Sequence, residues 1–255
     1  MFAHLDQYNA HALLTATVAF YGQIYFDFAG YSSMAIGTAR LFGYRFPRNF
    51  DYPCGSASVT EFWRRWHMSL SFWLRDYLYI PLGGNRGGLL AVCRNLTITM
   101  LLGGLWHGAA WNYVVWGLLH GVGLCANKIW NGLRPRLPAA MNWQGSWSRI
   151  TAILLTQLWV MVAWVFFRCD SVAEATNVLG SIIGLHPHPG AAIIPLELWI
   201  LLIIAIDHAL GRGVWRRSPS RGWAQALSWS GMGVLLALGL AAMPLVQKPF
   251  IYFQF

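Results

Sequence analysis

The chain has 255 residues, of which 56% are hydrophobic and 11% are charged. A typical soluble domain carries about 25% charged residues, so this chain has too little charge to solvate a water-facing surface of its size. Its 15 Trp and 14 Phe residues suit a membrane protein, in which aromatic rings lie at the headgroup level. The composition excludes an ordinary soluble domain and, without an internal break, predicts one membrane domain over residues 1–255.

The net charge is +9, from 18 basic and 9 acidic residues. In a soluble protein this excess would suggest binding to nucleic acid. Here the basic residues fall between long apolar runs, which is the pattern of cytoplasmic loops. The predicted partner is therefore the lipid bilayer, and nucleic acid is excluded.

Six apolar segments approach the about 20 residues that a helix needs to cross a bilayer. The fold class is therefore predicted to be all-α, a polytopic bundle of membrane helices. Most basic residues lie between spans one and two, three and four, and five and six, which places these loops in the cytoplasm. The localisation that follows from this pattern is a multi-pass membrane protein. The six segments are residues 12–36, 89–105, 109–126, 150–167, 193–210 and 227–246.

Residues 59–80 are too polar to span the membrane and too aromatic for a plain loop. Ser58 to Glu61 fits a capping box, and Pro81 marks a stop after the helix that begins there. This pattern predicts an amphipathic helix that lies in the membrane interface or re-enters beside the bundle. Its apolar face is predicted to consist of Phe62, Trp66, Leu70, Trp73 and Tyr77.

His107 lies in a glycine-rich turn between the second and third predicted spans. Histidine has an unperturbed pKa suited to proton transfer near neutrality, and buried ionisable groups in membranes are often functional. The alternative is a polar residue that joins two helices by hydrogen bonds, and the residues alone do not decide between the two.

His67 borders the charged face of the predicted interfacial helix. The residues alone favour an interfacial histidine in an aromatic belt over a functional one. Arg64 and Arg65, just before it, are suited to hold phosphate or carboxylate groups. They are equally suited to anchor the helix to lipid headgroups.

Asp27 lies within the first predicted span and shares a helix face with Gln23 and Tyr31. A carboxylate at the bilayer centre costs about 2.5–3.5 kcal/mol on insertion scales, so Asp27 is predicted to face the bundle interior. Its predicted partner is an arginine or the polar groups of the interfacial helix. A structural ion pair is favoured over catalysis. Asn112 shares a face with Trp116 and His120, which indicates a substrate cavity or, more simply, polar packing between helices.

Several familiar signals are absent from the sequence. It has no GxSxG elbow, no P-loop and no HExxH motif. The four cysteines form no CxxC pair, which gives no zinc signature and no disulfide framework, and no metal site is predicted. An enzyme with this sequence is expected to take its nucleophile from the substrate.

The chain resembles the membrane-bound O-acyltransferases, and among them the bacterial alginate O-acetylase branch. The resemblance runs from about residue 15 to the end, and its motifs are specific. They are Tyr25-Phe26-Asp27-Phe28-Ala29-Gly30-Tyr31-Ser32, Asn49-Phe50-Asp51-Tyr52-Pro53, residues 61–71 (EFWRRWHMSLS), residues 73–86 (WLRDYLYIPLGGNR), Trp106-His107-Gly108-Ala109-Ala110-Trp111 and residues 249–255 (PFIYFQF).

The resemblance implies a membrane O-acyltransferase with His107 and His67 as catalytic histidines. It implies transfer of an acyl group, in this branch acetyl, to hydroxyls of an exported polysaccharide, directly or through a periplasmic acetyltransferase. The implied donor is acetyl-CoA from the cytoplasm, with no bound cofactor. The expected substrate-binding residues are Asp27, Arg64, Arg65, Trp66, Arg75, Trp106 and Asn112.

Two further readings stay open at this point. One is a transporter or channel subunit, in which intramembrane Asp27, His107 and His120 form a proton or ion path. The other is a non-catalytic scaffold of a polysaccharide export complex. Because family members are longer than this chain, we expect it to correspond to their C-terminal portion.

Overall fold

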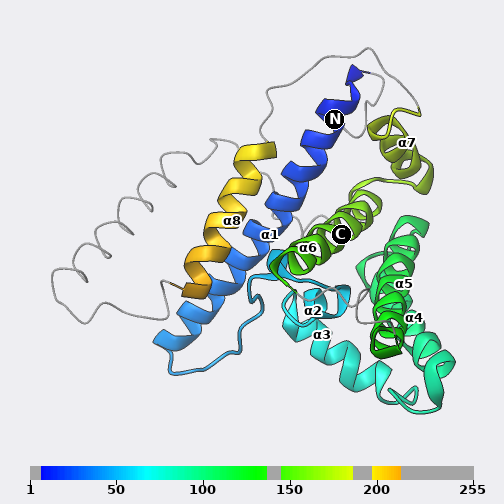
Figure 1. The fold of residues 1–255 in the computed structure, drawn as a ribbon. Helices are drawn as coiled ribbons and strands as arrows, with labels where there is room; N and C mark the ends of the chain where they lie inside the picture. Colours follow the sequence, from blue (N-terminus) through cyan, green and yellow to red (C-terminus); the bar gives the residue numbers. More distant parts are fainter. Residues whose placement is uncertain (1–6, 137–144, 186–196, 214–255) are drawn as a thin grey trace. The chain divides into compact units, whose positions relative to one another are not determined.

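The structure is a computed structural model that describes residues 7–136, 145–185 and 197–213 (Figure 1). The chain divides into two compact units, Met1–Ile204 and Ala205–Phe255. The described part of the second unit is the end of one helix, α8 (Glu197–Gly213). Within the described residues the secondary structure is helical, with no strand, which confirms the predicted all-α class.

Four of the predicted spans correspond to long helices of the first unit. Two helices, α4 and α6, are long and apolar enough to cross a membrane, judged by length and composition over the described residues. The predicted span 193–210 overlaps α8, and the span 227–246 lies outside the described residues. The helices are α1 (Ala10–Leu41), α4 (Gly88–His107), α5 (Trp111–Leu133), α6 (Ser146–Arg168) and a shorter α7 (Val172–Ile182).

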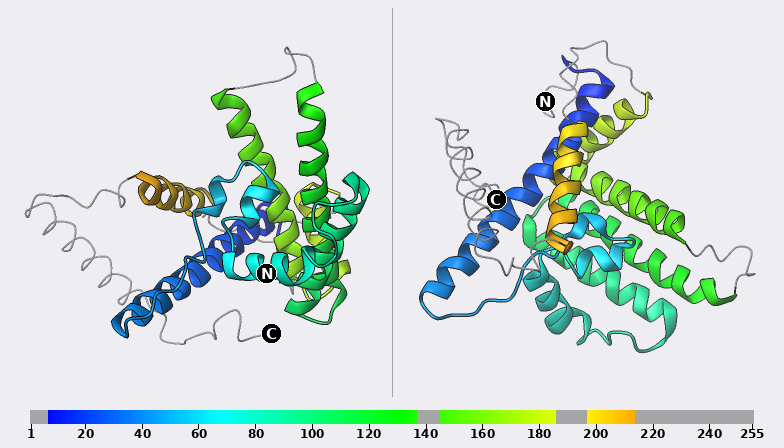
Figure 2. Two further views of the ribbon diagram at one scale, coloured as in Figure 1. Left: turned by 90° about the horizontal axis from the view of Figure 1, so that it is seen from below. Right: turned by 60° about the vertical axis from the view of Figure 1, so that its left-hand side comes forward.

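Helices α4 and α5 form a tight hairpin, and they lie side by side in Figures 1 and 2. Glycines let their backbones approach. A Cβ added at Gly104 would collide with the Tyr113 carbonyl oxygen, and one at Gly117 would collide with the Met100 carbonyl oxygen. Helices packed through small residues make close van der Waals contact. The packing therefore fixes the positions of residues at the end of the hairpin, where α4 ends and α5 begins.

The predicted helix 59–80 is wrong as a continuous element. It consists of α2 (Val59–Trp63), α3 (Met68–Leu74) and a π-helical turn, η3 (Arg75–Tyr79). The helix breaks before α3 because His67 adopts a left-handed backbone conformation, with φ +42°. A left-handed residue cannot continue a right-handed α-helix.

The break also divides the predicted apolar face. Phe62 and Trp66, which lie before it, are 0% and 1% exposed. Trp73 and Tyr77, beyond it, are 50% and 67% exposed. A single helical stripe over residues 62–77 is therefore wrong, since the chain changes direction at His67.

The predicted capping box is confirmed. The Ser58 hydroxyl accepts a hydrogen bond from the Glu61 backbone N–H at 3.1 Å. The Glu61 carboxylate reaches back to the Ala57 backbone N–H at 2.8 Å, one residue before the N-cap. These bonds satisfy N–H groups at the start of α2, which leads toward His67.

Candidate active site

His107 is the last residue of α4, and aromatic rings surround it. Its ring centroid lies 4.9 Å from that of Trp106, 5.0 Å from that of Trp116 and 5.1 Å from that of Phe167. The side chain is 8% exposed. The next residue is Gly108, at which an added Cβ would collide with the Tyr113 ring. His107 is thus held at the end of the glycine-packed hairpin, in an aromatic setting.

His67 occupies the break between α2 and α3. Its ring centroid lies 4.6 Å from that of Phe28 of α1, and its side chain is 9% exposed. Asn49 fixes the turn from outside: its carbonyl accepts from Met68 N–H at 2.9 Å, and its side-chain oxygen accepts from Ser69 N–H at 3.1 Å. A non-glycine residue in a left-handed conformation costs on the order of 1–3 kcal/mol, and such residues cluster at functional sites.

His67 and His107 are close enough to interact electrostatically, although they are far apart in the sequence. Their roles in catalysis, and a cavity shared between them, remain predictions.

A third histidine, His120 of α5, joins this group and also interacts electrostatically with His107. It is 0% exposed, and its Nδ1 accepts a hydrogen bond from the Trp63 Nε1–H at 3.2 Å. Its ring centroid is 4.8 Å from that of Trp116. His120 was predicted to share a helix face with Asn112 and Trp116, but not to be one of the catalytic or substrate-binding residues. The sequence does place His120 directly before Gly121 and three residues after Gly117, on a part of the helix where small residues allow close packing.

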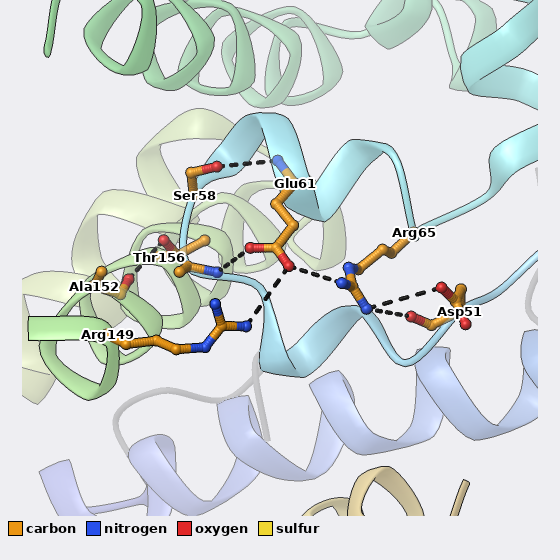
Figure 3. Close-up of polar contacts among 8 residues, drawn as sticks. Asp51, Ser58, Glu61, Arg65, Arg149, Ala152 and Thr156 are labelled. Atoms are coloured by element: carbon orange, nitrogen blue, oxygen red, sulfur yellow. Dashed lines mark hydrogen bonds and ion pairs between the residues drawn. The ribbon is translucent and has the colours of Figure 1, made fainter. Parts of the chain in front are cut away.

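Arg65 belongs to a cluster of charges (Figure 3). It contacts Glu61 at 2.8 Å, and its Nη1 lies 3.2 Å from the Asp51 carbonyl oxygen and 3.8 Å from the Asp51 carboxylate. Arg149 of α6 reaches the same Glu61 oxygen at 4.0 Å. Arg65 therefore holds the 51–65 segment together, whereas neighbouring Arg64 is exposed, without an ion-pair partner among the described residues.

Arg75 pairs with the adjacent Asp76 through two hydrogen bonds, of 2.7 and 3.1 Å. Its guanidinium also lies 5.0 Å from the centroid of the Phe72 ring. The hydrogen bonds from Arg75 lower the pKa of Asp76 below its ordinary value. Both side chains are exposed, so the pair is a surface feature of η3.

Asp27 does not meet an arginine or the 59–80 segment among the described residues. The side chain is exposed on α1, and its hydrogen-bonding neighbour is Gln23, one turn earlier, rather than an arginine. Tyr31, a further turn along, is 48% exposed. The predicted common face of these three residues therefore exists, but it is an exposed face within the described part of the chain.

The remaining predicted site residues differ in their surroundings. Trp66 is 1% exposed and stacks on Phe62 with 5.4 Å between ring centroids. Trp106 is 60% exposed beside His107. Asn112 is buried and donates to the Cys169 carbonyl at 2.8 Å, which ties the start of α5 to the end of α6.

The described residues contain no group of three or more His, Cys, Asp or Glu side chains arranged to hold a metal ion.

Residues 5–172 match the model of the membrane-bound O-acyltransferase family. The chain is similar to the "Probable alginate O-acetylase AlgI" of Pseudomonas syringae pv. tomato, with 49% identity over 165 residues, 64% of this chain and 30% of that protein.

Two relatives carry other names. A "Peptidoglycan O-acetyltransferase" of Helicobacter pylori is 43% identical over 164 residues, 64% of this chain and 30% of that protein. A "Teichoic acid D-alanyltransferase" of Streptococcus thermophilus is 35% identical over 170 residues, 56% of this chain and 38% of that protein. The chain spans about a third of the length of these curated relatives. The matched region contains His67, His107 and His120. The chain belongs to the membrane-bound O-acyltransferase family.

Proposed function

We propose that the chain takes part in O-acyl transfer, moving an acetyl group from a cytoplasmic donor toward hydroxyls of an exported polysaccharide. The acetyl group passes to the polymer directly or through a periplasmic acetyltransferase. The observation that carries the proposal is the burial of both His107 and His67 inside the region matched to the family. The names of two relatives, an alginate O-acetylase and a peptidoglycan O-acetyltransferase, support acetyl as the group and a polysaccharide as the acceptor.

His107 serves as the general base in this proposal. It accepts the proton of the acceptor hydroxyl while that oxygen attacks the carbonyl carbon of the acyl thioester. The carbon–sulfur bond then breaks, and the proton passes from His107 to the leaving thiolate. A positioned general base contributes about 100- to 10,000-fold to the rate.

His67 orients the acceptor hydroxyl beside His107. This role is supported by the left-handed turn at His67, which hydrogen bonds to Asn49 hold in place. The turn fixes the direction in which the imidazole leaves the backbone. Groups that hold reactants in an attack geometry act chiefly through orientation. Loss of His67 is therefore expected to reduce transfer less than loss of His107.

Arg64 is the better candidate for the donor's phosphates, since Arg65 already pairs with Glu61 and Asp51. Arg75, already paired with Asp76, is an exposed second contact on the same segment. Acetyl-CoA is the proposed donor, and these arginines are placed on the cytoplasmic side by the positive-inside rule. The protein is then a multi-pass protein of the inner membrane, with the acceptor on the opposite side.

The test is acetyl transfer from radiolabelled acetyl-CoA by membranes that contain the complete protein. His107→Ala is expected to lower the rate by about 100-fold or more while the protein still inserts and folds. His11→Ala, a change of an exposed histidine near the start of α1, is the matched control and should leave the rate unchanged. A folded His107→Ala protein that transfers at the wild-type rate would contradict the role of His107 and favour a scaffold.

A further inference from the structure

Three buried ring nitrogens in the aromatic cluster that includes His107 have no hydrogen-bond partner among the residues that the structure describes. They are Nε1 of Trp116, Nε2 of His120 and Nε1 of Trp164. Their side chains are 1%, 0% and 1% exposed, so bulk water does not reach them. A buried N–H donor without an acceptor is costly, and native proteins contain few of them. A bound oxygen acceptor within hydrogen-bond distance of such a donor would remove that cost.

The bond from Trp63 decides which nitrogen of His120 carries hydrogen. An indole N–H can only donate, so the His120 Nδ1 that it contacts must be the acceptor. The neutral imidazole then carries its hydrogen on Nε2, the nitrogen without a partner. His120 therefore presents a fixed N–H donor at Nε2 and cannot accept a proton there.

Trp116 places this donor next to His107. Its ring contacts both histidines, with centroids 4.8 Å from that of His120 and 5.0 Å from that of His107. Both contacts are edge-on, with interplanar angles of 71° and 84°. Trp116 and His120 are adjacent to Gly117 and Gly121, which press α5 against the backbone of α4. The two donors are thus fixed relative to His107 before any substrate binds.

We propose that the His120 Nε2–H and the Trp116 Nε1–H donate hydrogen bonds to the carbonyl oxygen of the acyl group during transfer. That oxygen gains negative charge when the acceptor hydroxyl attacks the carbonyl carbon. Fixed donors in a buried setting stabilise such charge without having to reorganise. The inference rests on the proposed function and adds oxyanion-stabilising groups to the base His107. No proton leaves His120 or Trp116 in this role.

Two substitutions of His120 separate this role from a structural one. His120→Asn keeps an acceptor near the former Nδ1 for Trp63 but removes the donor at Nε2. His120→Gln keeps an N–H donor near the former Nε2 but loses the acceptor for Trp63. We expect the Asn variant to lose about 100-fold in kcat with acetyl-CoA while KM changes little, and the Gln variant to retain kcat within about tenfold. If the Asn variant instead keeps more activity than the Gln variant, and the Gln variant has the lower Tm, His120 only supports the fold.

Trp116→Phe tests the second donor independently and decides the matter if a His120 variant does not fold. It removes the Nε1–H and keeps an aromatic ring in contact with both histidines. We expect kcat to fall about 10- to 100-fold with an unchanged Tm.

Unchanged kcat in folded His120→Asn and Trp116→Phe proteins, beside an active wild type, would overturn the inference, because the donors would then bind a buried water alone. A wild type that transfers no acetyl group from acetyl-CoA would instead contradict the proposed function.

Discussion

The α4–α5 hairpin and the segment from Asn49 to Tyr79 both contribute histidines to the candidate site, but different forces hold them. The hairpin relies on glycines that bring two backbones into contact. The segment relies on a side-chain clamp from Asn49 and on the ion pairs of Arg65 with Glu61 and Asp51. One histidine is therefore fixed by apolar packing, whereas the other depends on polar contacts around a strained turn. The two should respond differently to substitution.

The largest effect is expected from adding a side-chain atom at the contact between α4 and α5. Gly117→Ala places a Cβ against the Met100 carbonyl oxygen, which is backbone and cannot move aside cheaply. Overpacking of this kind costs about 1–3 kcal/mol or more, so Tm should fall and transfer should be lost. Gly30→Ala in α1 is the matched control, since an added Cβ there meets nothing within 4 Å. Thermal unfolding in detergent that gives equal Tm values for the two variants would refute the packing account.

The turn at His67 is expected to separate stability from activity. His67→Gly removes the strain of a left-handed non-glycine residue, so its Tm should hold or rise although the imidazole is gone. Transfer should nevertheless fall by about tenfold or more, since an orienting group is lost. His67→Ala should be less stable than His67→Gly, because it keeps the strain. If the Ala variant is as stable as the Gly variant, the backbone at this position is not strained.

The charge cluster is expected to distinguish two neighbouring arginines. Arg65→Gln leaves Glu61 with a weaker partner in a half-buried setting, and should cost about 1 kcal/mol after allowance for solvent screening. Arg64→Gln should leave Tm unchanged and raise the KM for acetyl-CoA, as expected for an exposed phosphate contact. Measuring Tm and KM for both variants tests the assignment. A raised KM in Arg65→Gln alone would reverse the roles proposed here.

The smallest effect is expected at the exposed pair of Arg75 and Asp76. Because folding lowers the pKa of Asp76, the stability from this pair is present above the unfolded pKa of about 3.9 and is lost as pH falls through the folded pKa. Arg75→Gln should therefore differ from wild type by a small, constant amount between about pH 5 and 8. The difference should shrink only in more acid solution. A difference that changes near neutrality would point to another titrating group.

The sequence by itself determined the helical membrane class and the family, and it singled out His67 and His107 as candidates. In lipid, a long apolar run can satisfy its own backbone hydrogen bonds only as a helix. The motifs around His67 and His107 are specific to the family. The capping box at Ser58 was also predictable, because it depends on residues three positions apart.

Only the tertiary structure decided the rest. The helix break at His67 depends on Asn49, which lies outside the predicted helix, so periodicity alone could not locate it. Asp27 was assigned to the bundle interior from a transfer cost, yet its surroundings depend on which face of α1 the other helices cover. His120 became a candidate only when the Trp63 bond and the unpartnered Nε2 were visible. Contacts between distant segments fix tautomers, strain and exposure, and no local pattern records them.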